Sequence, residues 1–140
     1  MNIAFFLVPK SDVSFLYDDY TLRQGLEKMN HHGYTAIPVI NREGKYLNTI
    51  SEGDFLWYIL RGDQSEEELL EKPMQSLESA LIKDVLHDDK NPPVPITASP
   101  EQLLTRALEQ NFIPVIDDSG SFIGIVTRRD ILKYFSAPLE

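Results

Sequence analysis

The chain contains no cysteine, which excludes disulfide bonds, thiolate metal sites and thiol nucleophiles. Absence of cysteine also fits a reducing compartment. The apolar run nearest the start, Ile3 to Val8, is six residues long and has no basic residue before it. A run this short predicts neither a signal peptide nor a membrane helix. We therefore expect a cytoplasmic protein with no membrane partner.

Basic residues are outnumbered, with 13 Lys and Arg against 22 Asp and Glu, a formal net charge of −9. An acidic surface repels the phosphates of nucleic acids, so no nucleic-acid partner is expected, and a bound anion would need local positive charge.

Residues typical of catalysis or metal binding are also scarce. His31 and His32 are adjacent, so on a helix they would project about 100° apart, and His87 is distant in sequence, which predicts no metal site. The chain has no Gly-rich phosphate loop that ends in Lys-Ser/Thr and no nucleophile elbow. These absences predict that the protein is not an enzyme.

What the sequence does contain is a duplication. Turn glycines Gly44 and Gly120 are 76 residues apart, and so are Ser51 and Thr127, and Asp54 and Asp130. A period this long indicates a duplicated module. With 140 residues, 42% of them hydrophobic, the chain can form one globular protein built from two repeats.

Each repeat predicts the same elements in the same order. The first repeat has a strand near residues 13–16, a helix from a Thr21 cap to Gly33, strands at 34–40 and 45–50, and a helix after Ser51. In the second repeat the corresponding ranges are 91–96, a helix from Ser99, 111–116, 122–126 and a helix after Thr127. Residues 3–8 are expected to form a short helix or strand. Because proline cannot donate to a strand ladder, Pro38 is expected at an edge or a strand start.

The junction between the last strand and helix carries the strongest chemical signal. Thr127 is placed as an N-cap, and Asp130 follows three residues later, as in a capping box. Arg128 and Arg129 in the first turn oppose the helix dipole, which indicates an anion above this helix end. The alternative is a cap alone, with solvated arginines that pair with the acidic turn at 117–118.

The two copies, and above all Phe112 to Asp117 and Gly124 to Leu132, resemble a tandem pair of CBS domains, called a Bateman module. The resemblance places the repeats at 8–60 and 80–136 with a connector at 61–79. It implies an α/β (α+β) fold of two pseudo-symmetric β-α-β-β-α repeats packed sheet against sheet, with clefts between them.

The family binds adenosine-containing ligands, and the resemblance implies a site in each repeat. Asp130 and Asp54 would accept the ribose hydroxyls, Thr127 and Ser51 would hold phosphate, and the backbone before each proline would hold the base. Tyr34 and Phe112 either contact the base or pack as ordinary rim residues. The implied ligand-binding residues are Lys10, Ser11, Tyr34, Thr35, Ala36, Pro38, Ser51, Asp54, Asn111, Phe112, Ile113, Pro114, Thr127, Arg128, Arg129 and Asp130.

Departures from the family pattern make the first copy the weaker site. Asn48 replaces the glycine that matches Gly124, so a ligand is expected to approach the backbone less closely there. Glu52 and Gly53 replace the two arginines, and Glu52 would repel phosphate. The resemblance extends to receptors for cyclic di-AMP, which use a lysine where this chain has Asp12, and Lys10 is the candidate substitute.

We therefore predict a non-enzymatic regulatory module that binds AMP, ADP or ATP, needs no other cofactor, and signals its occupancy to an effector protein. The alternatives are a cyclic di-AMP receptor, a CBS pair that binds no ligand and acts as a scaffold, and a small enzyme acting on nucleotides. Exposed apolar helix faces predict a homodimer.

Overall fold

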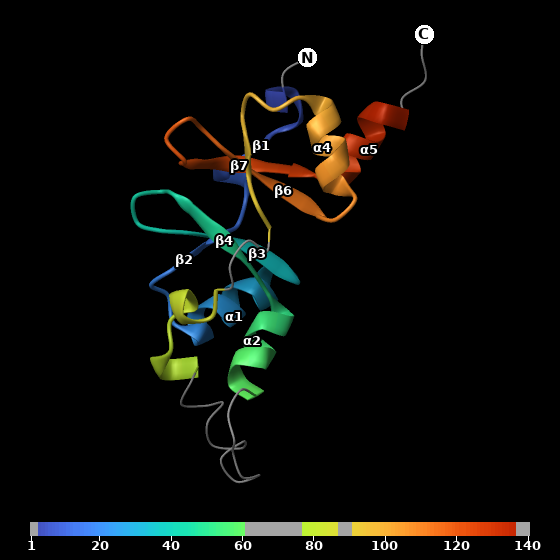
Figure 1. Cartoon of the computed structure of the whole chain (residues 1–140). Helices are drawn as coiled ribbons and strands as arrows, with labels where there is room; N and C mark the ends of the chain where they lie inside the picture. Colours follow the sequence, from blue (N-terminus) through green and yellow to red (C-terminus); the bar gives the residue numbers. More distant parts are fainter. Residues whose placement is uncertain (1–2, 61–76, 87–90, 137–140) are drawn as a thin grey trace. The chain divides into compact units, whose positions relative to one another are not determined.

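The computed structural model describes residues 3–60, 77–86 and 91–136 (Figure 1). These residues form two compact units. The repeat-1 unit contains residues 14–42, 47–60 and 77–86, and the repeat-2 unit contains 3–13, 43–46 and 91–136. Most of the predicted connector, and His87, lie outside the described residues.

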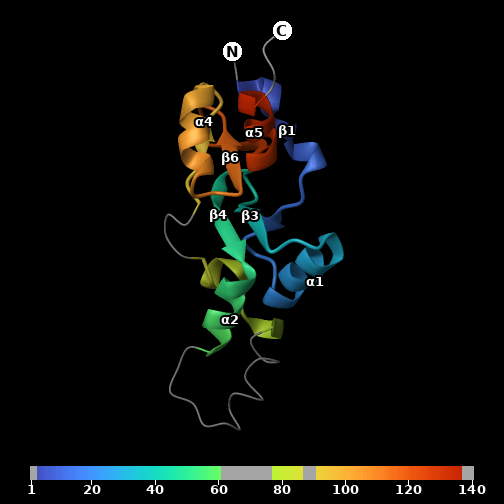
Figure 2. The same ribbon diagram turned by 90° about the vertical axis from the view of Figure 1, so that its right-hand side faces the viewer.

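The repeat-2 unit is built on a four-stranded sheet of order β1-β7-β6-β5. Its elements are η1 (Ile3–Phe6), β1 (Val8–Pro9), η2 (Lys10–Asp12), β5 (Val94–Pro95), α4 (Pro100–Ala107), β6 (Phe112–Ile116), β7 (Phe122–Thr127) and α5 (Arg128–Ser136). Strand β5 is parallel to β6, whereas β1 and β6 are antiparallel to β7. Helices α4 and α5 lie side by side in both views (Figures 1 and 2).

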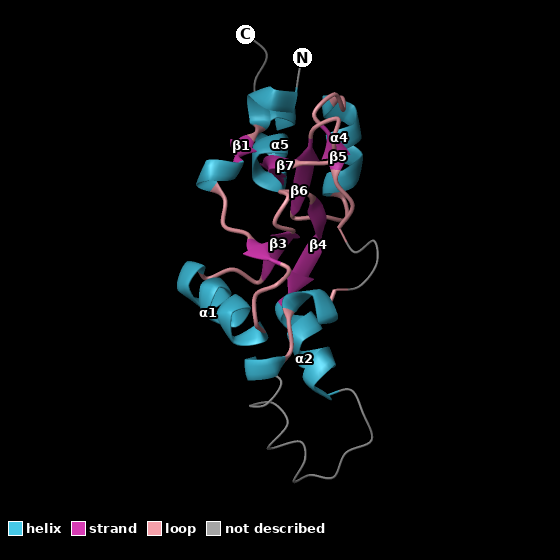
Figure 3. Ribbon diagram, turned by 90° about the vertical axis from the view of Figure 1, so that its left-hand side faces the viewer, coloured by secondary structure: helices cyan, strands magenta, loops and turns pink. Residues whose placement is uncertain are grey.

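The repeat-1 unit has a three-stranded sheet of order β2-β3-β4. Strand β2 is labelled in Figure 1, and β3 and β4 are also labelled in Figure 3. Its elements are β2 (Leu16–Tyr17), α1 (Leu22–His32), β3 (Ala36–Ile40), β4 (Tyr46–Ser51), α2 (Glu52–Leu60), helical residues 77–79 and η3 (Ile82–Asp84). The predicted β-α-β-β-α order and the mixed α and β class are thus confirmed in both repeats. Packing of one repeat against the other, sheet against sheet, stays a prediction.

Each unit has its own hydrophobic core, and each core is completed by a segment from outside the β-α-β-β-α repeat. In the repeat-2 unit, Ile3 is fully buried with Ile113 and Ile131. In the repeat-1 unit, Ile82 is fully buried with Ile37 and other residues of its repeat. Burying an isoleucine side chain contributes about 1.5–3 kcal/mol, so η1 and η3 are integral parts of these units.

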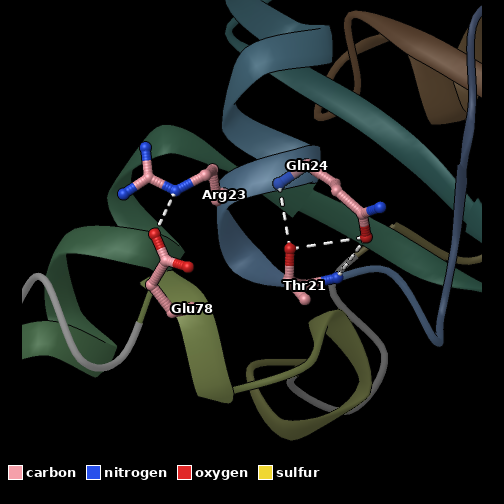
Figure 4. Close-up of polar contacts among 4 residues, drawn as sticks. All are labelled: Thr21, Arg23, Gln24 and Glu78. Carbon is pink, nitrogen blue, oxygen red and sulfur yellow. Dashed lines mark hydrogen bonds and ion pairs between the residues drawn. The ribbon is translucent and has the colours of Figure 1, made fainter.

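Helix α1 begins and ends as its sequence predicts. Thr21 and Gln24 form a reciprocal capping box (Figure 4). Gly33 ends the helix in the left-handed conformation, with φ 69°. Nearby, Arg23 Nε lies 2.7 Å from Glu78 Oε1, which ties helical residues 77–79 to α1. Because an exposed ion pair contributes about 0–1 kcal/mol, burial of Ile82 holds this segment more strongly than the ion pair does.

The expectation that Pro38 lies at an edge or a strand start is wrong. It lies within β3, which is the middle strand of its sheet, and Pro114 lies within β6 in the same way. The neighbouring parallel strands are only two residues long, and they pair with β3 at Val39 and Ile40 and with β6 at Val115 and Ile116. Both prolines precede these pairings, so the missing N–H removes no bond to the short parallel strand.

Within the described ranges, none of the helices has both the length and the apolar character needed to cross a bilayer.

Candidate functional site

The Thr127 to Asp130 motif lies where β7 runs directly into α5. Thr127 Oγ1 accepts a hydrogen bond from the backbone N–H of Asp130 at 3.2 Å, so the predicted cap forms. The reciprocal bond from the Asp130 carboxylate is not formed. In the part of the chain that the structure describes, this carboxylate has no hydrogen bond or ion pair, and the residue is only half-buried. Asp130 is therefore available to a ligand.

The equivalent motif in the first repeat is closed on itself. Asp54 is 7% exposed, and its Oδ2 accepts bonds from the backbone N–H of Ser51 at 2.8 Å and from Ser51 Oγ at 3.1 Å. Its carboxylate is thus used in a complete capping box. The equivalent aspartates therefore differ. Asp54 caps its helix, whereas the carboxylate of Asp130 is available to a ligand.

Arg128 makes contacts with its own repeat. Its Nε donates to the carbonyl oxygen of Ala107 and its NH1 donates to Asn111 Oδ1, both at 2.7 Å. The first bond holds the last carbonyl of α4, a group that a helix leaves without an internal partner. Arg129 is exposed and has no hydrogen bond or ion pair among the described residues.

The alternative pairing of these arginines with the turn at 117–118 is not observed. Asp117 Oδ1 instead accepts bonds from the backbone N–H groups of Ser119 and Ser121 and from Ser119 Oγ. These bonds, with that from the Ser119 side chain first, hold the pKa of Asp117 below its ordinary value. Asp117 thus stabilises its own hairpin turn.

A groove of about 540 Å³ lies beside Asp130 in the repeat-2 unit. Helix α5 contributes Asp130, Lys133 and Tyr134 to one wall, and residues 5–8 of the N-terminal segment form the other. The volume is in the range of about 300–1,000 Å³ typical of small-molecule sites. This groove, which we call the α5 groove, combines an available carboxylate, a cation and an apolar wall.

A second groove, of about 460 Å³, lies in the repeat-1 unit at the end of α1. It is lined by Leu26, Met29, Asn30, Gly33, Tyr34 and Glu52. Tyr34 is 38% exposed and its ring stacks on that of His32, with centroids 5.5 Å apart. Ser51 and Asp54 do not line this groove, whose charged residue is Glu52, so it does not favour a phosphate.

The remaining predicted residues divide between the two units. The carbonyl oxygen of Thr35 accepts a hydrogen bond from the backbone N–H of Glu52 at 3.0 Å. The carbonyl oxygen of Asn111 accepts the equivalent bond from Arg128 at 2.8 Å, so each repeat contains the same backbone contact. The side chains of Pro38, Ile113 and Pro114 are buried, whereas Ala36 and Phe112 are half-buried at the strand starts. Their predicted contact with a base, through the backbone, stays a prediction.

Lys10 and Ser11 belong to η2 in the repeat-2 unit, although they precede the first repeat in sequence. Lys10 Nζ lies 3.8 Å from the position that a Cβ on Gly44 would occupy, so this ammonium group is directed at the turn at 43–46. Ser11 is exposed. Neither residue lines the α5 groove.

Gly124 permits a close backbone approach, but the approaching group belongs to the chain itself. Strand β1 pairs with β7 here, and a Cβ on Gly124 would lie 2.2 Å from the carbonyl oxygen of Val8. The absence of a side chain at Gly124 thus allows β1 to pair with β7 at this position. Asn48, the equivalent residue, is buried, and its Oδ1 accepts the backbone N–H of Thr49.

Sequence reasoning missed Phe5 to Val8, Lys133 and Tyr134. For the helix residues a signal was present, because Asp130, Lys133 and Tyr134 have i, i+3 and i+4 spacing and must share one face of α5. Nothing local in residues 5–8 indicates that they lie beside a helix more than 120 residues later in the chain.

As for metals, no group of three or more His, Cys, Asp or Glu residues is placed to hold an ion within residues 3–60, 77–86 and 91–136.

Comparison with known proteins identifies the repeats. The model of the CBS domain family matches residues 7–61 and 82–137. An uncharacterised protein of Methanocaldococcus jannaschii is 27% identical over 139 residues, which cover 84% of this chain and 83% of that protein.

Solved structures similar to this chain include CbpB proteins in complex with c-di-AMP. One is 26% identical, with a TM-score of 0.84 over 98% of this chain and 85% of that chain. Another, from Listeria monocytogenes, is 26% identical, with a TM-score of 0.78 over 95% of this chain and 93% of that one.

Proposed function

Because the chain belongs to the CBS domain family, we propose that it is a non-enzymatic regulatory module that binds an adenosine-containing nucleotide. The observation that carries this proposal is the carboxylate of Asp130, which has no partner among the described residues and lines the α5 groove. An ionised carboxylate accepts hydrogen bonds only, and it can take both hydroxyls of a ribose. A buried or paired carboxylate, such as that of Asp54, cannot do this.

The same observations favour one nucleotide site per chain. Asp130 is available and lies near Lys133, whereas Asp54 is closed in its capping box and the nearby groove carries Glu52. A nearby cation attracts the ligand's phosphate and strengthens binding, whereas a nearby carboxylate repels it and weakens binding. The repeat-2 site is therefore the nucleotide site, and the repeat-1 motif has a structural role.

A cyclic di-AMP receptor is the second candidate. It is supported by the likeness to CbpB proteins solved with that ligand, which extends over nearly the whole chain. Both candidates require a ribose and a phosphate in the same site. They differ in whether a second adenosine is needed for tight binding. They also differ at the ribose, because the 3′ oxygen of cyclic di-AMP is esterified and only its 2′-hydroxyl can donate to Asp130.

A thermal-shift panel with AMP, ADP, ATP, cyclic di-AMP, NAD and S-adenosylmethionine tests the function. A ligand at 100 times its dissociation constant should stabilise the protein by about 2.7 kcal/mol, and it should be recovered unchanged. No shift with any compound would favour the scaffold alternative. Consumption of the ligand during incubation would favour the enzyme alternative.

We also expect a homodimer, and an effector protein to which occupancy of the site is signalled. Leu56 and Trp57 on α2 are 57% and 65% exposed, and Leu132 and Phe135 on α5 are 53% and 41% exposed. Clustered apolar side chains of this size are normally covered, most often by a symmetric copy. The cytoplasmic location stays a prediction.

Light scattering at micromolar concentration should give twice the chain mass of 16.0 kDa. Trp57→Glu places a charge on the exposed face of α2 and should shift the protein toward the monomer. The exposed polar residue Gln102 on α4 offers the control, since Gln102→Glu should leave the mass unchanged. A monomeric parent protein would contradict this prediction.

A further inference from the structure

The positive charge for a ligand phosphate must come from a group that the fold leaves available. At the start of α5 the donors are largely in use. The backbone N–H of Arg128 donates to the Asn111 carbonyl at 2.8 Å, and that of Asp130 donates to Thr127 Oγ1 at 3.2 Å. The Arg128 guanidinium is held by Ala107 and Asn111. Arg129 is available, but it does not line the α5 groove. Within this groove the first turn of α5 therefore offers little to a phosphate, despite its sequence.

Lys133 is a better-placed cation. It follows Asp130 by three residues, so the two side chains share one face of α5, about 4.5 Å apart along the helix axis. Both line the α5 groove. Lys133 is exposed, and its ammonium group has no hydrogen bond or ion pair within the described ranges. A carboxylate and an ammonium group at this spacing match a ribose and its neighbouring 5′-phosphate.

The opposite wall of the groove is aromatic and aliphatic. Phe6 is buried and makes an edge-to-face contact with Tyr134, with centroids 4.9 Å apart, which holds the N-terminal segment against α5. Phe5 contacts Phe6 in the same manner but is 76% exposed. An exposed ring beside a groove offers a flat surface on which a nucleobase can stack.

We propose that a nucleotide binds in the α5 groove with its ribose on Asp130, its phosphate on Lys133 and its base against Phe5 and the residues that follow it. This pose rests on the proposed nucleotide-binding function. It makes Lys133 the phosphate contact in place of Arg128, which positions α4 and Asn111. It also makes the N-terminal segment a part of the binding site.

Titration calorimetry with AMP and with adenosine tests the pose. Lys133→Met removes the charge and keeps most of the apolar stem, so AMP binding should weaken roughly tenfold or more while adenosine binding stays the same. Phe5→Ser should weaken both ligands about equally, by several-fold. Lys83→Met, which removes an exposed lysine of the repeat-1 unit, is the matched control and should change neither affinity.

The outcomes separate the pose from the function it rests on. A parent protein that binds neither AMP nor cyclic di-AMP overturns both. A parent that binds AMP, with Lys133→Met binding it equally well, overturns the pose and leaves the function standing. Equal losses for AMP and adenosine in Lys133→Met would also overturn the phosphate assignment. Melting temperatures of the variants, measured without ligand, show whether each remains folded.

Discussion

Asp130→Ala is expected to weaken nucleotide binding by roughly 10- to 150-fold and to change stability little. The affinity loss corresponds to about 1.5–3 kcal/mol, the usual contribution of hydrogen bonds to a charged group. Stability should fall by less than about 1 kcal/mol, because Thr127 Oγ1 still caps the helix through the backbone of residue 130.

Asp54→Ala is the matched variant, and the opposite result is expected: it should lower stability and leave nucleotide affinity unchanged. Here the removed carboxylate accepts two bonds from Ser51 and is buried. Losing it leaves a backbone N–H without its partner, which costs about 1–3 kcal/mol of stability. Nucleotide affinity should remain close to that of the parent protein.

Calorimetry and urea denaturation on both variants measure the two quantities. If Asp130→Ala keeps its affinity and loses stability, the Thr127 to Asp130 motif is only a helix cap. If Asp54→Ala loses affinity as strongly as Asp130→Ala, both repeats contribute to nucleotide binding. The prediction of a single site in the second repeat would then be wrong.

Gly124→Ala is expected to abolish nucleotide binding. The new Cβ would lie 2.2 Å from the Val8 carbonyl oxygen and 2.9 Å from Leu7 Cδ1, so β1 must move away from β7. Val8 and Leu7 line the α5 groove, and the site would lose part of its wall. Overpacking of this kind costs about 1–3 kcal/mol, in addition to strain at a φ of 153°.

Gly120→Ala is the control that separates the effect of backbone strain from the effect of displacing β1. Gly120 also has a positive φ, of 84°, but the nearest atom to its new Cβ would be Lys45 Cδ at 3.9 Å. This variant should lose about 1–2 kcal/mol of stability from backbone strain and keep its affinity. Parent-like affinity in Gly124→Ala, measured by the same titration, would show that β1 is not needed for the site.

The sequence by itself determined the features that depend on near neighbours in the chain. The constant 76-residue offset identified the duplication, and hydroxyl residues at Thr21, Ser99 and Thr127 predicted helix starts that the structure confirms. Helix caps, hairpin turns and hydrophobic periods are short-range hydrogen-bonding and burial patterns, so a local stretch of sequence specifies them. The local pattern also predicted Asp130 as the capping-box partner of Thr127, whereas its role as a ligand residue came from the resemblance to CBS domains.

Only the tertiary structure decided which groups meet across long sequence distances. The segment at 3–13 joins the repeat-2 unit, and residues 77–86 complete the other core. Glu52 and Gly53 indicated a weaker first site, but no local pattern shows that the Asp54 carboxylate is bonded to Ser51, or that Arg128 is held by Ala107 and Asn111. Tertiary packing determines these partners. A carbonyl at a helix end needs a donor, and a core must be filled, but the fold decides which side chain lies close enough to do so.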